Sequence, residues 1–267
     1  MSYEHLSLER RGQVAIATLR RPEKLNALNG RLQDEQRDVC RAVEEDDELR
    51  VLILTGDGRG FSAGADLTAG GRAGGDEGPP PQGERLDEYG WIGRQAISVY
   101  RMTKPTIAAV NGVAAGAGMS LALACDIRVG SVKARFKTVF VERSLSPDSG
   151  MSYFLPRIVG YSRAADLIFS SRSVDSEEAY RIGLLDRVVS HERLLDEAIE
   201  LANQIATWPP MAVRSAKRVL QRNLLNDLEA ALREEYAGLG YARRAPNDAR
   251  ESIASFLEKR APKFTGT

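Results

Sequence analysis

The sequence predicts an α/β fold, with a core of repeated β-β-α units followed by a helical section. Two observations support the α/β core: strand-like and helix-like segments alternate up to about residue 160, and two glycine-flanked segments, 61–67 and 111–118, each follow an apolar strand-like run. Beyond that point the hydrophobic pattern is almost wholly helical. This predicts a helical section able to cover a neighbour.

Length and charge limit the possible functions. A chain of 267 residues is long enough for one large domain, alone or with a helical appendage, and 43% hydrophobic residues are ordinary for a globular protein. The 37 basic residues balance the 37 acidic ones. Charge therefore gives no reason to expect a nucleic acid or an anionic membrane as a partner.

Cysteine usage and the first residues indicate the compartment. Cys40 and Cys125 lie far apart in the sequence, which argues against a disulfide scaffold and a zinc site and favours a reducing environment. The chain does not open with a basic segment followed by an apolar one, and no apolar run reaches the roughly 18 to 20 residues of a membrane span. We therefore expect a cytoplasmic protein without a bound metal.

Hydrophobic periodicity predicts the first elements. Residues 4–19 alternate around a turn at 10–13, which predicts a hairpin whose second strand ends at Pro22. The amphipathic pattern over 30–48 predicts a helix, and the apolar run 51–55 predicts a buried strand.

The segment between Thr68 and Gly90 has a different composition. Its glycines and prolines cannot hold a helix or a central strand, which predicts a mobile loop, either a lid over a ligand or an insertion. The alternation then resumes, with a helix at 91–102, a strand at 106–110, a helix at 119–125 and a short strand at 126–130.

The C-terminal part is predicted to be helical, apart from a short strand near 186–189. An apolar helix at 151–158 precedes it, and Asp175 with Glu178 is typical of a capping box. We divide the chain into a core, 1–200, and a C-terminal helical region, 201–267. The predicted helices cover 162–170, 175–182, 191–207, 211–222, 226–240 and 246–260.

The two glycine-flanked segments are the strongest candidates for chemistry. Small residues in 61–67 and 111–118 leave backbone N–H groups open to a ligand oxygen, and a pair of such donors can form an oxyanion hole. The glycine order of the second segment, G-x-x-x-G-x-G, differs from the G-x-G-x-x-G of a dinucleotide-binding loop. No acidic residue ends a following strand at the expected distance, so a dinucleotide site is disfavoured.

Four motifs together resemble those of the crotonase superfamily, the enoyl-CoA hydratases and isomerases: Phe-Ser-Ala-Gly-Ala-Asp-Leu, Ala-Ala-Val-Asn-Gly-Val-Ala-Ala-Gly-Ala-Gly, Cys-Asp-Ile and Leu-Pro-Arg-Ile-Val-Gly. The resemblance covers nearly the whole chain. It implies the crotonase spiral of β-β-α units, an acyl-CoA thioester substrate, no cofactor, and a homotrimer or dimer of trimers built through the C-terminal helices. The motif Pro-Asp-Ser-Gly at 147–150 is most similar to that of ring-1,2-epoxyphenylacetyl-CoA isomerases.

The resemblance implies that two residues form the oxyanion hole. The backbone N–H groups of Ala65 and Ala117 match the donors that hold the thioester carbonyl oxygen. Ala117 precedes a predicted helix, whose positive end favours a developing enolate. Losing one such donor typically costs about 3 kcal/mol of transition-state stabilisation. The same two segments supply further expected substrate contacts: Ala63, Gly64, Asp66, Leu67 and Gly116.

The acid–base residue distinguishes the possible reactions. Ser120 and Phe140 stand where hydratases of this family have two glutamates, and neither side chain can activate water at neutral pH. Asp148 instead resembles the active-site aspartate of the epoxide isomerases and of some enoyl- and dienoyl-CoA isomerases. Helix capping is the alternative role for Asp148. Glu142 is as readily explained by a surface ion pair.

The remaining candidates concern CoA and the acyl group. Lys24, Leu25 and Ala27 resemble the CoA-contacting loop of the family, and Lys259 lies in a segment similar to its last helix, whereas a lone lysine is often only solvated. The two residues at the hydratase glutamate positions can line a pocket for an aromatic or medium-chain acyl group, or can belong to the core.

These expectations combine into one reaction. We expect an acyl-CoA isomerase in which Asp148 moves a proton on an enolate held by Ala65 and Ala117, with ring-epoxide or double-bond isomerisation as the reaction, as in phenylacetate-type degradation. The alternatives are an enoyl-CoA hydratase of fatty-acid β-oxidation and a catalytically silent acyl-CoA-binding or RNA-binding homologue. The neutral charge weakens the RNA alternative.

Overall fold

The strands form two sheets in the computed structural model, which describes residues 3–68, 82 and 86–267. Within these residues the larger sheet has six strands in the order β1-β2-β3-β5-β7-β10, and the smaller has four in the order β4-β6-β8-β9. The larger sheet contains β1 (Leu6–Arg11), β2 (Val14–Leu19), β3 (Val51–Gly56), β5 (Thr106–Val110), β7 (Ile127–Ser131) and β10 (Arg187–Val189). The smaller sheet contains β4 (Gly60–Ser62), β6 (Val113–Ala115), β8 (Arg135–Lys137) and β9 (Val174–Asp175).

Strand direction follows the connections. The hairpin β1–β2 is antiparallel because a short turn joins its strands, whereas β3, β5, β7 and β10 run parallel to β2. In the smaller sheet β4, β6 and β8 are parallel, and β9 pairs antiparallel with β8.

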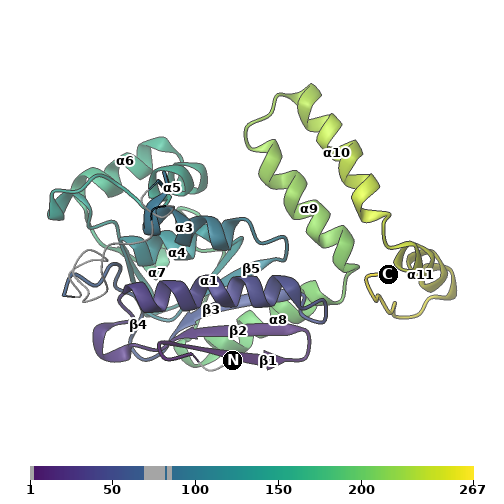
Figure 1. Cartoon of the computed structure of the whole chain (residues 1–267), viewed down its shortest axis with the longest axis horizontal. Coiled ribbons are helices and arrows are strands. Elements are labelled where there is room, and N and C mark those ends of the chain that lie inside the picture. Colours follow the sequence, from purple (N-terminus) through teal and green to yellow (C-terminus); the bar gives the residue numbers. More distant parts are fainter. Residues whose placement is uncertain (1–2, 69–81, 83–85) are drawn as a thin grey trace.

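The chain repeats one unit, in which it passes from a strand of the larger sheet to a strand of the smaller sheet and then into a helix (Figure 1). The pairs β3–β4 and β5–β6 lead to α3 (Gly90–Tyr100) and α4 (Ala117–Ala124), and β7–β8 leads to α5 (Met151–Val159). The predicted α/β core of β-β-α units is confirmed. The sequence pattern missed the smaller sheet because strands of two or three residues are too short to show alternation.

Alternation along the larger sheet creates two apolar faces. Val14 and Ile16 of β2 pack in the cluster that includes α8 (Leu194–Ala206), whereas Ala15 and Ala17 belong to the cluster on the other face, with α1 (Gly30–Glu45). The second cluster also contains buried residues of α4 and β4, so it fills the space from which the glycine-flanked segments emerge. Two further helices, α6 (Tyr161–Ser170) and α7 (Ser176–Arg181), follow α5.

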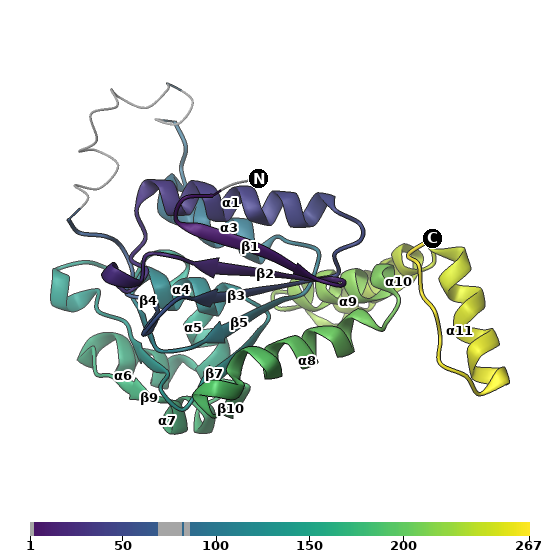
Figure 2. The same ribbon diagram turned by 90° about the horizontal axis from the view of Figure 1, so that it is seen from below.

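The last three helices project away from the sheets. α9 (Pro210–Asn223) and α10 (Leu228–Ala242) form a hairpin, and α11 (Pro246–Glu258) follows on the side of the molecule far from β4 (Figures 1 and 2). The predicted domain boundary at residue 200 lies inside α8, whose last turns still pack on the larger sheet through Leu201, Ala202 and Ala206. In the structure the change of architecture therefore comes after α8.

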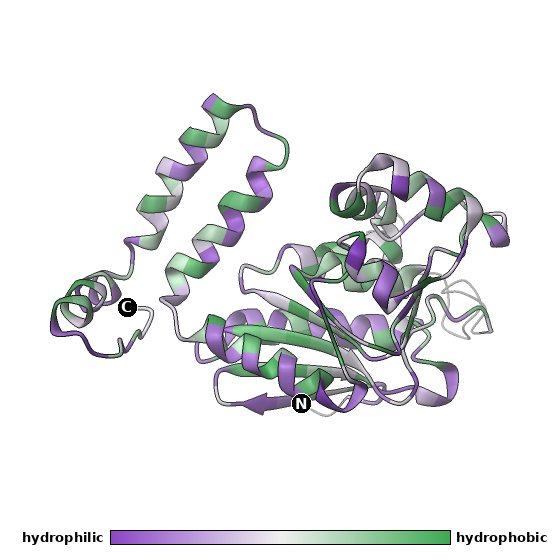
Figure 3. Cartoon of the chain, turned by 180° about the vertical axis from the view of Figure 1, so that it is seen from behind, coloured by the Kyte–Doolittle hydropathy of each residue, from purple (hydrophilic) through white to green (hydrophobic). Residues whose placement is uncertain are grey.

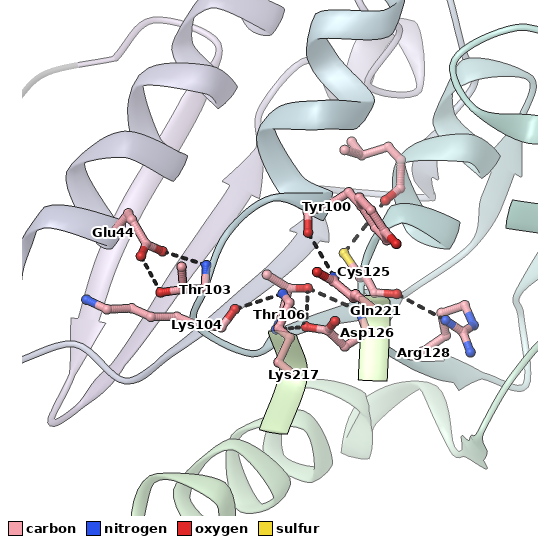
Figure 4. Close-up of polar contacts among 11 residues, drawn as sticks. Glu44, Tyr100, Thr103, Lys104, Thr106, Cys125, Asp126, Arg128, Lys217 and Gln221 are labelled. Carbon is pink, nitrogen blue, oxygen red and sulfur yellow. Dashed lines mark hydrogen bonds and ion pairs between the residues drawn. The ribbon is translucent and has the colours of Figure 1, made fainter. Parts of the chain in front are cut away.

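A polar cluster attaches α9 to the core (Figure 4). Lys217 Nζ lies 2.7 Å from Asp126 Oδ2 and donates to the Lys104 carbonyl oxygen at 3.0 Å. The same Asp126 oxygen accepts from the backbone N–H of Thr106 at 2.7 Å, and Gln221 of α9 donates to the Tyr100 carbonyl. These contacts hold the second half of α9 against the core.

Many large apolar side chains on these helices are exposed. Figure 3 shows apolar residues recurring along α9 and α10. The exposed apolar set is Leu220, Leu224, Leu225, Leu228, Leu232, Tyr236, Leu239, Ile253, Phe256 and Leu257. We call it the C-terminal apolar face.

The predicted Gly/Pro loop falls largely on residues that the structure does not describe. Residues 69–81 and 83–85 of the predicted Gly/Pro loop lie outside the described residues, so its role as a lid stays a prediction.

Cys40 and Cys125 are both buried free thiols. Across the described segments, we find no helix with both the length and the apolarity to cross a bilayer.

Candidate active site

A cavity of about 420 Å³ lies where the two glycine-flanked segments meet the first turns of α1 and α3. Its remaining wall comes from the chain between β8 and α5. The lining residues are Leu28, Asn29, Gly30, Gln33, Ala63, Gly64, Ala65, Asp66, Leu67, Trp91, Ile92, Gly116, Ala117, Val139, Phe140, Arg143, Leu145 and Asp148.

Close backbone packing brings the two segments together. Gly64 has φ +93, and a Cβ atom there would lie 2.7 Å from the Ala115 carbonyl oxygen and 3.4 Å from the Ala117 nitrogen. Gly116 precedes α4 with φ +48. Only glycine adopts these backbone angles without strain and permits this approach. The prediction that Ala65 and Ala117 lie on one cavity wall therefore follows from the glycines beside them.

The backbone groups beside the two predicted donors form hydrogen bonds within the protein, whereas the N–H groups of the two donors themselves form none among the described residues. Leu28 N–H donates to the Gly64 carbonyl at 2.7 Å, and Asp66 N–H donates to the Leu28 carbonyl at 3.0 Å. Ala117 is the first residue of α4, where a backbone N–H has no acceptor within the helix. Among the described residues, no hydrogen bond occupies the N–H of Ala65 or Ala117. Two free donors and the positive end of α4 suit an oxyanion.

Asp148 lines the same cavity and does not cap a helix. α5 begins after Gly150 and no side chain caps it, so the capping alternative is wrong. The Asp148 carboxylate accepts a hydrogen bond from the Ser149 hydroxyl at 2.9 Å. Burial raises the pKa of Asp148 above its usual value, and the Ser149 bond offsets part of that effect. A carboxylate with a raised pKa is a stronger base.

Asp66 is the second carboxylate among the lining residues, and its surroundings lower its pKa instead of raising it. Its side chain is 5% exposed, lies 2.8 Å from Arg21 Nη2 and accepts from the Thr68 hydroxyl at 2.7 Å. The Thr68 hydrogen bond, followed by Arg21, lowers the pKa of Asp66 to about 2. Asp66 therefore stays ionised and fixes the loop around Arg21 against the first glycine-flanked segment.

The predicted CoA-contacting loop lies beside this segment. Ala63 N–H donates to the Leu25 carbonyl at 2.9 Å, which positions the loop near the oxyanion donors. Of this loop and the residue after it, Leu28 lines the cavity, whereas Lys24, Leu25 and Ala27 are not among the lining residues. Lys259 directly follows α11, which lies on the far side of the molecule from α4 (Figures 1 and 2). Within one chain Lys259 does not reach the cavity.

The two residues at the hydratase glutamate positions have different surroundings. Phe140 lines the cavity, whereas Ser120 is fully buried in α4 and donates weakly to the Asp148 carbonyl at 3.4 Å. Ser120 therefore supports the Asp148 loop from behind. Glu142 forms an exposed ion pair with Lys137 at 2.6 Å, so it belongs to the surface.

Several cavity residues were not predicted from the sequence. Trp91 and Ile92 follow the predicted Gly/Pro loop, and Arg143 and Leu145 lie in a stretch without a motif. Gln33 lies on the buried face of α1, where a polar residue is unusual. That misplaced polar residue was the only sequence signal for it.

Comparison with known proteins identifies the class. Residues 9–267 match the family model described as enoyl-CoA hydratase/isomerase, and the chain belongs to this family of enzymes. It is 38% identical over 261 residues to 1,2-epoxyphenylacetyl-CoA isomerase of Escherichia coli, covering 95% of each chain. It is 36% identical over 262 residues to short-chain-enoyl-CoA hydratase of Clostridium acetobutylicum, covering 97% of each.

Solved structures agree on the fold. Enoyl-CoA hydratase from Bacillus anthracis superimposes with a TM-score of 0.90 at 32% identity, over 99% of this chain and 100% of that one. A monofunctional enoyl-CoA isomerase from M. smegmatis gives 0.72 at 33% identity, over 85% and 98%. The predicted crotonase fold is therefore confirmed, and the family includes both reactions under consideration.

Proposed function

We propose that the protein is an acyl-CoA isomerase that holds a thioester enolate and moves one proton with Asp148. The carbonyl oxygen accepts from the backbone N–H groups of Ala65 and Ala117. The Asp148 carboxylate removes a proton from the carbon beside the carbonyl. It returns the proton to another carbon, which shifts a double bond, or to the epoxide oxygen that is released when the enolate electrons form a double bond to the ring and break the adjacent C–O bond. The reaction needs no metal, flavin or nicotinamide.

The contrast between the two cavity carboxylates is the observation on which this proposal rests. Asp66 is held ionised by Thr68 and Arg21 and is a weak base. Asp148 faces the same cavity with a pKa raised by burial and no basic partner among its described hydrogen bonds. The absence of a glutamate at positions 120 and 140 further favours one-carboxylate isomerisation over hydration.

The substrate class and assembly belong to the same proposal. The relative from Escherichia coli is named for an epoxyphenylacetyl thioester, and the aromatic lining residues Trp91 and Phe140 suit an aromatic acyl group in phenylacetate-type degradation. We also infer a homotrimer or dimer of trimers in the cytoplasm, with the C-terminal apolar face as the subunit contact.

Direct assays separate the candidate reactions. The protein is incubated with a 3-enoyl-CoA, with 1,2-epoxyphenylacetyl-CoA and with crotonyl-CoA, and products are identified by mass spectrometry. We expect isomeric products of unchanged mass from one or both of the first two, lost in Asp148→Asn by a factor of about 10² to 10⁴. Addition of water to crotonyl-CoA as the main reaction would instead identify a hydratase, and tight CoA-thioester binding without any product a silent homologue.

A further inference from the structure

Two buried glutamines beyond the cavity have side-chain polar atoms without hydrogen-bond partners among the described residues. Gln95 of α3 is 1% exposed, and neither its Oε1 nor its Nε2 has a partner among the described residues. Gln36 of α1 is fully buried, and its Oε1 also lacks one. Buried carboxamides are almost always paired, because an unpaired one loses its bonds to water without replacement. These groups therefore call for a ligand or a water.

Helical spacing connects them to the cavity. Gln95 comes three residues after Ile92, which lines the cavity, and residues three or four apart share a helix face. Gln36 is likewise three residues after Gln33, another lining residue. Ser98 joins the two helices, since Gln36 Nε2 donates to Ser98 Oγ at 3.1 Å and Ser98 Oγ donates to the Gln95 carbonyl at 2.7 Å.

Gln33 is the member of this group that a ligand meets first. It is 4% exposed and lies on the cavity wall, and the hydrogen bonds of the described residues include none to its side chain. A hydrocarbon acyl group filling the cavity would cover this carboxamide and leave it unpaired. An acyl group with a hydroxyl, ether or carbonyl oxygen could pair with it.

We propose that Gln33, with Gln36 and Gln95 behind it, selects acyl-CoA substrates whose acyl group has an oxygen substituent in addition to the thioester. This inference rests on the proposed acyl-CoA function and names its substrate class more narrowly. Apolar lining residues, including Leu28, Trp91 and Ile92, hold the hydrocarbon part. Sites that hydrogen-bond a substrate oxygen discriminate strongly against analogues without it.

Calorimetric binding tests the inference without depending on turnover. The ligands are phenylacetyl-CoA and its 2-, 3- and 4-hydroxy derivatives, which contain no side-chain double bond to move. We expect at least one hydroxy derivative to bind about tenfold more tightly than phenylacetyl-CoA. Gln33→Leu and the near-isosteric Gln33→Met should remove that preference. The control Gln204→Leu, at an exposed position of α8, should retain it.

The outcomes separate this inference from the proposed function. Binding of all four ligands with equal affinity, or a preference unchanged in both Gln33 variants, would overturn the oxygen selection and leave the isomerase proposal standing. Failure of all four thioesters to bind would overturn both. A thermal melt identifies a Gln33 variant that does not fold. In that case the wild-type protein still tests the oxygen selection, because equal affinity for all four ligands would overturn it.

Discussion

Asp66 and Asp148 line one cavity, yet their surroundings shift their pKa values in opposite directions. Asp66 accepts hydrogen bonds from Thr68 and Arg21, which stabilise its charged form. Among the described residues, Asp148 accepts a side-chain hydrogen bond only from the neighbouring Ser149 hydroxyl, and its burial disfavours the charged form. Paired titratable groups with diverging pKa values are typical of catalytic sites. Their partners therefore suit Asp66 to a structural role and Asp148 to a reactive one.

The raised pKa of Asp148 predicts that its ionised carboxylate lowers the free energy of unfolding of the wild-type protein. Above the usual carboxyl pKa the folded state must bury part of a negative charge, and this cost disappears when Asp148 is protonated. Asp148→Asn should therefore raise the free energy of unfolding at pH 7 by about 0.5–2 kcal/mol, with the difference vanishing at low pH. Urea titrations measure it. The exposed control Asp57→Asn should show no change, and a destabilised Asp148→Asn would contradict the account.

Asp66 predicts the opposite pH dependence. Because its pKa is lowered in the folded protein, it stabilises the fold above the usual carboxyl pKa, and that contribution is lost as the pH falls toward about 2. Asp66→Asn leaves Arg21 buried without its partner and should cost about 3 kcal/mol at pH 7. The gap between the two proteins, measured by urea unfolding, should narrow between about pH 4 and pH 2. A gap that is constant with pH would show that the ion pair is not its source.

Residue types alone predicted part of this site. The small residues around Ala65 and Ala117 indicated open backbone donors, and a family resemblance drew attention to Asp148. The opposite environments of the two aspartates depend on Thr68 and Arg21, and the sequence does not say which side chains meet. Gln33 belongs to no motif; its place on a buried helix face marks it as unusual, and the structure adds that it lies on the cavity wall.

At the scale of elements, the site depends on how α4 begins. The sequence predicted this helix from residue 119, but it begins at Ala117. Glycine has a low helix propensity, so Gly118 made the first turn look like a loop. Packing decides otherwise, because a Cβ atom at Gly118 would lie 2.3 Å from the Ser62 carbonyl oxygen of β4. The glycine lets the helix end approach the smaller sheet.

Gly118→Ala should therefore separate the two oxyanion donors. The added methyl group meets backbone, which cannot move aside cheaply, and overpacking of this kind costs about 1–3 kcal/mol of stability. We expect kcat/KM for the isomerase reaction to fall by about tenfold or more while circular dichroism stays native. The matched control is Gly240→Ala in α10, where a Cβ atom would meet nothing within 4 Å. Equal activity in both variants would contradict the role of close packing.

The main strands and helices were predictable because their periodicity extends over five or more residues. The smaller sheet was not, since β4, β6 and β8 have three residues each. Their pairing depends on contacts between segments far apart in the chain, such as Gly60 with Val113. Long-range pairing leaves no local pattern to read.

At the scale of the whole molecule, the C-terminal apolar face is the main feature that one chain leaves incomplete. On α10, Leu228, Leu232, Tyr236 and Leu239 recur on one side of the helix, and each is more than half exposed. Exposed apolar surface of this kind marks an interaction site. The sequence predicted amphipathic helices here, but how they pack against a second copy depends on surfaces from two chains, which periodicity cannot specify.

Sedimentation equilibrium tests the assembly. We expect a mass of three or six times the 29.3 kDa chain. The double variant Leu232→Asp and Tyr236→Asp should dissociate it, because each added charge would be buried in the contact. The control Glu229→Gln, on the same helix, should leave the assembly intact. A wild-type protein that remains a monomer at micromolar concentration would overturn the proposed role of the C-terminal apolar face.

Solvent exchange at the carbon beside the thioester carbonyl tests the central claim most directly. A saturated acyl-CoA such as phenylacetyl-CoA is incubated with the protein in D₂O, and deuterium at that carbon is followed by NMR. If Ala65 and Ala117 hold the enolate and Asp148 moves the proton, the wild-type protein catalyses exchange and Asp148→Asn loses it by at least about 10²-fold while still binding the thioester. Exchange at the wild-type rate in Asp148→Asn would contradict the account.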